Sequence, residues 1–315
     1  MNLFFLGSAL NLSSLYMLAG TGAAFSIKSG NLNFGGEGQI YLGGFVAAII
    51  LAHVNFLPAA LALPLAFIAA ALASGLMALI SGLLKHTRNA DFLFTSFLAS
   101  SALIPIIDGL VIGPFRSKTD NLLATPFIAQ KFRFASLMPP STFNITFFIA
   151  IFFCIFFYLL INKTAFGRKL VIYGISPEFS KFAGYNNRGF IYSSAFVSGA
   201  MHGLCGAFAV AGTYFTCHQG FYSGMGWSAF STALLAGANP LLMIPSSLFL
   251  GFITTYANRY ALYNNVGFDI SSLIQAFILL IVSFSVFKTQ GLSHRKEHRD
   301  KSDDDTRGLK GAQTC

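Results

Sequence analysis

Glu37 is the only acidic residue among the first 90 residues, and it lies in the glycine-rich stretch "GNLNFGGEGQIYLGG" between two apolar segments. Six of these fifteen residues, Gly30 to Gly44, are glycine, and Asn33 and Gln39 add polar amides. An ionisable group at membrane depth indicates a functional site by default. The glycines permit a broken helix whose freed backbone groups meet a polar substrate. The alternative is that Glu37 and Gln39 brace a neighbouring helix or lie at the membrane interface.

A second group of chemically capable side chains consists of His202, Cys205, Cys217 and His218. Such residues are zinc ligands, but their spacing matches no standard zinc site. We therefore favour a packed cysteine and a hydrogen-bonded histidine, and we expect no metal and no cofactor. The chain has four cysteines in all. They show no pairing pattern, so no disulfide framework is expected.

Motifs for nucleotide binding and for hydrolysis are absent from the sequence. The dipeptide Gly-Lys does not occur, so the chain has no phosphate-binding loop of the G-x-x-x-x-G-K-[ST] type. Neither G-x-S-x-G nor H-E-x-x-H occurs. These absences predict a protein that is not itself an enzyme and that does not bind ATP through such a loop.

The composition indicates the element type that must position these residues. Of the 315 residues, 55% are hydrophobic and only 10% are charged, whereas a soluble domain carries roughly 25% charged residues. We expect an all-α polytopic membrane protein with about 8–9 transmembrane helices. The expected spans are Leu3–Ala24, Ile40–Leu57, Ala59–Leu84, Phe92–Ile112, Phe143–Ile161, Ile191–Val210 and Ile270–Phe287, with a further block at Ala229–Tyr256.

Basic residues set the expected orientation. The loop Asn162–Gly189 holds five Lys/Arg, and the tail from Lys288 holds seven, so both are placed in the cytoplasm. Parity then requires the block Ala229–Tyr256 to be two short passes or a re-entrant pair that turns at "GANP". The basic loop Gly113–Pro140 falls outside. Residues 1–290 are expected to form one transmembrane domain, followed by a disordered tail at 291–315.

Four blocks of the sequence resemble one protein family. "SGNLNFGGEGQIYLGG" is similar to the "GLFNIGAEGQLLLGA" signature of permease subunits of ABC importers for nucleosides and simple sugars. "TAFGRKLVIYGISPEFSKFAGY" resembles the cytoplasmic coupling segment of that family, although Val171, Ile172, Ser180 and Lys181 depart from it. "SGAMHGLCGA" and "GMGWSAFSTALLAGANP" resemble two further family segments. In the first block, Gly30, Asn33, Gly35, Glu37, Gly38, Gln39 and Gly43 fit the signature.

The resemblance implies a permease subunit that works by alternating access in the bacterial inner membrane. It implies a second permease subunit, cytoplasmic ATP-binding subunits and an extracytoplasmic substrate-binding protein, with membrane lipid around them and no nucleic acid. Implied substrates are nucleosides, riboflavin-like vitamins or simple sugars. Expected site residues are Asn33, Glu37 and Gln39 on the substrate path, Thr164, Gly167, Gly174, Ser180 and Gly184 in coupling, and Gly199, Gly203 and Gly206 in helix packing.

The rival interpretation is a secondary transporter or channel that works alone. Such a carrier needs acidic residues at the membrane midplane for ion coupling. Besides Glu37, the apolar segments offer only Asp108, near the end of a span. A requirement for ATP and for partner subunits distinguishes the two interpretations.

Overall fold

The structure, a computed structural model, describes residues 3–119, 121–264 and the single positions 273, 276, 277 and 280. Within these residues it is all-helical. The helices are α1 (Leu3–Lys28), α2 (Gly36–His53), α3 (Ala59–Arg88), α4 (Phe92–Ile112), α5 (Thr146–Lys163), α6 (Ala165–Ile175), α7 (Pro177–Phe182), α8 (Asn187–Ala209), α9 (Met225–Leu235) and α10 (Met243–Tyr263), with a 3₁₀ turn at Gln130–Phe132 and a π-turn at Val210–Tyr214.

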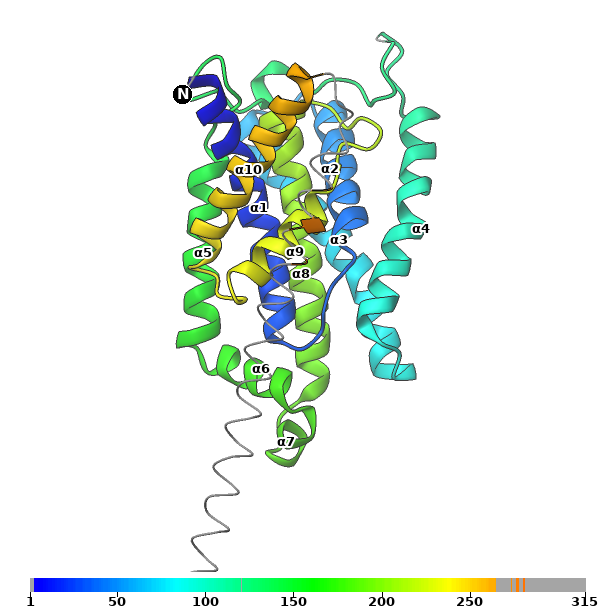
Figure 1. Cartoon of the computed structure of the whole chain (residues 1–315). Coiled ribbons are helices and arrows are strands. Elements are labelled where there is room, and N and C mark those ends of the chain that lie inside the picture. Colours follow the sequence, from blue (N-terminus) through cyan, green and yellow to red (C-terminus); the bar gives the residue numbers. More distant parts are fainter. Residues whose placement is uncertain (1–2, 120, 265–272, 274–275, 278–279, 281–315) are drawn as a thin grey trace, which may run out of the picture.

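The helices run between two ends of one bundle (Figure 1). The N-terminus, residues 113–145 and residues 215–224 lie at one end, and α6 and α7 lie at the other, which we call the α7 end. In the part of the chain that the structure describes, five helical segments are long and apolar enough to cross a membrane: α1, α3, α4, α5, and α8 with its π-turn. The all-α polytopic architecture expected from the sequence is confirmed. The expected span Ile270–Phe287 and the tail at 291–315 lie outside the two described ranges.

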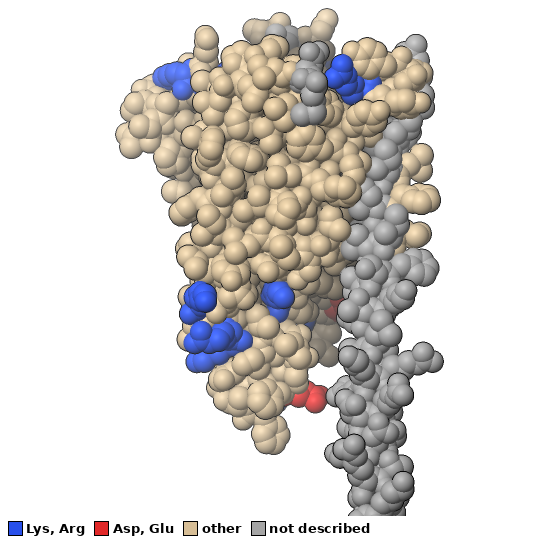
Figure 2. Space-filling view, turned by 60° about the vertical axis from the view of Figure 1, so that its left-hand side comes forward, with Lys and Arg blue, Asp and Glu red and all other residues tan. Residues whose placement is uncertain are grey.

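Burial separates a central helix pair from a peripheral set. In the most apolar windows of α1 and α8, 61% and 78% of residues are buried, against 22–28% for α3, α4 and α5. Small and polar residues line the central pair, while leucine and phenylalanine cover the outside of α3, α4 and α5. Since lipid is as apolar as these side chains, the peripheral helices need no protein cover. Figure 2 shows Lys and Arg side chains at the two ends, with an uncharged band between them on the visible face.

Residues 229–256 form the turn that parity requires. α9 has only 11 residues, the chain reverses at residues 236–242, and α10 returns to the end that holds the N-terminus. Gly237 (φ +58°) and Ala238 (φ +54°) provide the left-handed backbone of this reversal. The expected re-entrant pair is therefore present, with its turn inside the "GANP" segment.

Several helix boundaries differ from those expected. α2 begins at Gly36, four residues before the first apolar residue Ile40, and α5 and α8 begin at Thr146 and Asn187. The Asn186 amide oxygen caps α8 by accepting from the Gly189 N–H at 3.3 Å, whereas no side chain caps the start of α2 or α5. Capping places a helix start at the polar residue before the apolar run, which hydropathy alone misses.

Candidate functional site

Glu37 lies in the first turn of α2, where that helix meets the start of α9. Its Oε1 accepts a hydrogen bond from the Trp227 backbone N–H at 3.0 Å, and its side chain is only 8% exposed. The first N–H groups of a helix have no partner within the helix, and they favour a negative group. Close approach requires glycine here, because a Cβ on Gly226 would lie 2.5 Å from the Glu37 backbone nitrogen.

A cavity of about 320 Å³ opens beside Glu37. Its walls include Phe34, Phe97, Ser100, Tyr222 and Trp227, from four different parts of the chain. The ring centroids of Phe34 and Trp227 are 5.6 Å apart, and those of Phe97 and Trp227 are 6.2 Å apart. Glu37 Oε2 is buried and has no hydrogen-bond partner. The cavity thus combines aromatic surfaces with one unsatisfied acceptor.

Asn33 and Gln39, also expected on the substrate path, do not line this cavity. Both are 2% exposed, and the Asn33 amide donates to Gln39 Oε1 at 2.9 Å and to Ser198 Oγ at 2.8 Å. Gln39 Oε1 also lies 2.8 Å from His202 Nδ1. In this structure the two amides fasten the segment before α2 to α8, while Glu37 alone of the three borders the cavity.

The segment between α1 and α2 is held against α4 by serine side chains. The N–H of Phe34 donates to Ser96 Oγ at 3.0 Å, and the N–H of Gly38 donates to Ser100 Oγ at 2.7 Å. A Cβ on Gly38 would come within 2.8 Å of the Ser100 backbone oxygen. The glycines around Glu37 therefore permit backbone contact with α4 and α9 and bring the carboxylate to the cavity.

His202 and the cysteines do not assemble a metal site. His202 is held by Gln39, and Cys205, Cys217 and Cys154 are free thiols in buried positions. Among the described residues, no group of three or more His, Cys, Asp or Glu is placed to hold a metal ion.

The five residues expected in coupling build the corner from α5 to α8. Thr164 caps α6, Ser180 is buried and donates to Asn187 Oδ1 at 2.7 Å, and Gly184 (φ +74°) ends the turn after α7. Gly167 and Gly174 pack against backbone: a Cβ would lie 2.2 Å from the carbonyl oxygen of Leu160 and of Lys28, respectively. These residues set the backbone conformation of the corner. Other side chains form most of its exposed surface.

Three apolar side chains that the sequence reasoning missed form that surface. Ile175 is 80% exposed, Phe179 is 61% exposed and Phe182 is 96% exposed. They belong to α6 and α7, the helices at the α7 end of the bundle (Figure 1). Apolar residues inside an otherwise polar, basic loop were the available signal.

The three packing glycines on α8 lie at two different helix crossings. A Cβ on Gly199 or Gly203 would strike α3, at 2.6 Å from Ser74 O and 2.5 Å from Ala70 O, respectively. A Cβ on Gly206 would lie 2.0 Å from the carbonyl oxygen of Ile40 on α2. α8 therefore packs tightly between α2 and α3.

Basic residues of the loop 113–140 are partly used within the loop itself. The Arg133 guanidinium lies over the rings of Phe127 and Phe215, at 5.7 and 5.0 Å from their centroids, and Nε donates to Ile128 O at 3.0 Å. Lys131 donates to Asn55 O at 2.5 Å. The Lys118 side chain is exposed.

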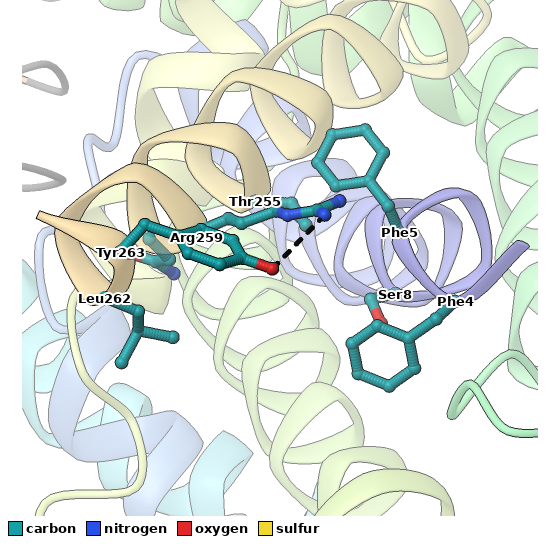
Figure 3. A pocket seen from close by; sticks show the side chains of 8 residues that line it. Phe4, Phe5, Ser8, Thr255, Arg259, Leu262 and Tyr263 are labelled. Atoms are coloured by element: carbon teal, nitrogen blue, oxygen red, sulfur yellow. Dashed lines mark hydrogen bonds between the residues drawn. The ribbon is translucent and has the colours of Figure 1, made fainter. Parts of the chain in front are cut away.

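A separate cavity of about 530 Å³ lies between α1 and α10 (Figure 3). Its charged group, Arg259, lies over the rings of Phe5 and Tyr263 and donates to the Tyr263 hydroxyl at 3.5 Å. The other lining residues include Phe4 and Leu262. No buried acceptor without a partner lines it among the described residues, which distinguishes it from the cavity at Glu37.

Trp227, Phe97 and Ser100 are among the cavity residues that sequence reasoning did not single out. Trp227 is the single tryptophan of the chain and lies inside the family-like block "GMGWSAF", which was a usable signal. Phe97 and Ser100 sit in an apolar span among 36 phenylalanines and many serines, where no local pattern marks them.

Known proteins of similar sequence were then compared with this chain. A family model described as "Branched-chain amino acid transport system / permease component" matches residues 5–283. The probable riboflavin import permease protein RfuC of Treponema pallidum is 33% identical over 279 residues, covering 86% of this chain and 72% of that protein. The guanosine ABC transporter permease protein NupP of Bacillus subtilis is 27% identical over 292 residues, covering 90% and 82%.

A further relative is the glucose ABC transporter permease protein TsgB13 of Haloferax volcanii, which is 25% identical over 286 residues, covering 86% of this chain and 74% of that protein. No solved structure matches the chain. Since the family model spans most of the sequence and the chain is a multi-pass helical protein, it belongs to the branched-chain amino acid transport system / permease component family and is a permease subunit of an ABC transporter.

Proposed function

We propose that this permease imports a small ring-bearing solute, a nucleoside or a riboflavin-like vitamin, across the bacterial inner membrane by alternating access. The observation that carries the proposal is the cavity at Glu37, in which Phe34, Phe97 and Trp227 offer faces for a flat ring. Relatives named for riboflavin and guanosine support the same class, and one named for glucose keeps simple sugars as a second candidate.

ATP hydrolysis is assigned to separate cytoplasmic subunits that dock at the α7 end. Ile175, Phe179 and Phe182 provide exposed apolar contacts there, and the exposed Lys163, Arg168 and Lys169 add positive charge to the same α5–α8 corner. This is the mixture of apolar anchor and polar rim that a protein interface uses. Thr164, Gly167, Gly174, Ser180 and Gly184 hold the surface in shape. This permease subunit contributes no catalytic residue.

Two further partners complete the proposed importer. An extracytoplasmic binding protein delivers the solute at the end that holds the N-terminus, where Lys118 offers an exposed positive group. A second permease subunit, identical or homologous, closes the path, and lipid surrounds the peripheral helices. Residues 1–290 then form one permease domain, with 291–315 as a cytoplasmic tail.

Stand-alone secondary transport is less well supported. Of its two candidate coupling acids, Asp108 accepts a hydrogen bond from the Tyr41 hydroxyl at 2.6 Å, while Glu37 is held by the Trp227 N–H. All the relatives reported above except RfuC carry "ABC transporter permease" in their names.

The proposed orientation predicts one-sided chemical labelling. In a Cys315→Ser background, Phe182→Cys should react with a membrane-impermeant maleimide in inverted vesicles and not in intact cells, because the 96% exposed side chain lies at the α7 end. Lys118→Cys, at the opposite end, is the matched control and should show the reverse pattern. The buried thiols Cys154, Cys205 and Cys217 should stay unlabelled. Labelling of Phe182→Cys from outside contradicts the orientation.

Reconstitution tests the function itself. Permease, ATP-binding subunits and binding protein in proteoliposomes should take up tritiated guanosine or riboflavin only with ATP and the binding protein present. The isolated permease should hydrolyse no ATP, because the chain lacks a phosphate-binding loop. Uptake by the isolated permease driven by an ion gradient would instead establish the secondary carrier.

A further inference from the structure

We infer that the cavity beside Glu37 binds an uncharged planar heteroaromatic ring through a hydrogen bond from a ring N–H to Glu37 Oε2, and that it rejects the phosphorylated form of the same compound. The inference rests on the proposed import function for its choice of ligands. It assigns a specificity-determining role to Glu37 and a stacking role to Trp227.

Glu37 Oε2, the carboxylate oxygen without a partner, needs a hydrogen-bond donor. Oε1 is held by the Trp227 N–H, so the orientation of the carboxyl group is fixed, while Oε2 is buried without a partner. A buried acceptor without a partner is costly, and a ligand N–H removes that cost on binding. Since Glu37 lines the cavity, a group that enters the cavity can supply that donor.

The aromatic walls favour a flat ring. Trp227 and Phe97 remain 36% and 41% exposed although their centroids are 6.2 Å apart, so each offers surface to a ligand. Phe34 is fixed edge-on to Phe230, with centroids 4.5 Å apart at 79°. A base or an isoalloxazine ring gains from contact with such faces, and a free sugar does not present a π face.

The charge of the cavity excludes phosphate. Among the described residues that line it, none is lysine, arginine or histidine. Helix N-termini also bind phosphate, but the start of α9 is already occupied by Glu37. A phosphate brought here would meet a carboxylate and no cation. Nucleosides and riboflavin therefore fit, whereas nucleotides and flavin mononucleotide do not.

Trp227 allows a direct test, because it is the single tryptophan of the chain and its fluorescence reports on this cavity. The purified full-length permease in detergent is titrated with riboflavin and with guanosine, and free N-acetyltryptophanamide corrects for absorption by the ligand. We expect saturable quenching by at least one of them. The corresponding phosphates, flavin mononucleotide and guanosine monophosphate, and the ring-capped analogues, 3-methylriboflavin and 1-methylguanosine, should bind about tenfold more weakly or worse.

Glu37→Gln is the decisive variant, since it keeps the shape and the acceptor for Trp227 but turns a donor toward the ligand N–H. It should lose about tenfold in affinity for the ring compound, whereas Glu178→Gln, which removes a distant exposed carboxylate on α7, should bind normally. Equal binding of the capped or phosphorylated analogues, unchanged affinity in Glu37→Gln, or no quenching by either ring compound overturns the inference. Quenching as expected without ATP-driven uptake would refute the proposed import function and leave the binding site standing.

Discussion

Gly206→Ala is expected to lower the free energy of unfolding of this permease by about 1–3 kcal/mol, the usual cost of overpacking a tight core. The added Cβ would lie 2.0 Å from the carbonyl oxygen of Ile40 and 2.6 Å from the backbone nitrogen of Gly44. Both obstacles are backbone atoms of α2 and cannot rotate away. The α2–α8 pair has to separate by roughly 1 Å, and each lost contact along the crossing weakens the bundle.

The measurement is the thermal unfolding midpoint of the detergent-solubilised protein, together with its yield in the membrane. Gly109→Ala on α4 is the matched control, because a Cβ there meets nothing within 4 Å; it should unfold at the wild-type temperature. Gly43 lies at the same crossing, where a Cβ would come within 2.2 Å of Gly203 O. Once Gly206→Ala has separated the helices, adding Gly43→Ala costs less free energy. The Gly43→Ala/Gly206→Ala double variant should therefore show less than additive destabilisation. A wild-type midpoint for Gly206→Ala contradicts the tight crossing.

The sequence predicts helix type and helix order well, because a lipid environment restricts the backbone to helices and hydropathy then locates them. It predicts poorly which helices are central. α1 and α8 are long and apolar enough to span a membrane, as α5 is, yet they are the buried pair, with a mean hydropathy of 1.4 against 2.1 for α5. Their glycine, serine and alanine content was the physical cause, since only small residues allow close helix contact. Boundaries such as Gly36 depend on close backbone contacts at glycine that hydropathy does not record.

The candidate site, too, could be predicted from the sequence only in part. Glu37 was identifiable as a lone acid in an apolar chain, and the structure gives it a cavity and an unsatisfied oxygen. Gln39, two residues further along the first turn of α2, faces a different side of the helix, and Asn33, which precedes α2, donates to Gln39 and Ser198 instead. Trp227 meets Glu37 across 190 positions of sequence, and a contact at that separation has no local signature.

Gly174→Val is expected to reduce ATP-driven uptake by roughly 5–150-fold, the range of a lost coupling free energy of about 1–3 kcal/mol. Gly174 lies on α6, where the proposed ATPase contact begins, and a Cβ would come within 2.2 Å of Lys28 O and 3.0 Å of the Gly30 backbone nitrogen. Gly30 itself has φ +67°, and its own Cβ would lie 2.9 Å from Gly174 O. The α6 backbone at Gly174 is therefore in direct contact with the backbone of the segment around Gly30 that leads to Glu37.

That segment is tied to the rest of the bundle immediately afterwards. Asn31 donates to Ser194 Oγ on α8 at 2.7 Å and accepts from Lys85 Nζ on α3 at 2.6 Å. A displacement of α6 can thus be transmitted toward the cavity through a few direct contacts. A valine at position 174 would push α6 away from the Gly30 segment and break this connection. Ligand quenching of Trp227 should persist, and ATP hydrolysis should continue without transport. Gly109→Val on α4, where a Cβ meets nothing within 4 Å, is the matched control and should transport normally.

The ratio of transport to hydrolysis decides how Gly174 acts. If Gly174→Val lowers uptake and hydrolysis in equal proportion, or loses the ATPase on purification, then Gly174 serves the ATPase contact and not the link to the Gly30 segment. If uptake is unchanged, the close backbone contact is not needed for coupling. Only hydrolysis without uptake, together with retained ligand binding at Trp227, fits a mechanical link between α6 and the cavity, because each half then works while the connection between them has failed.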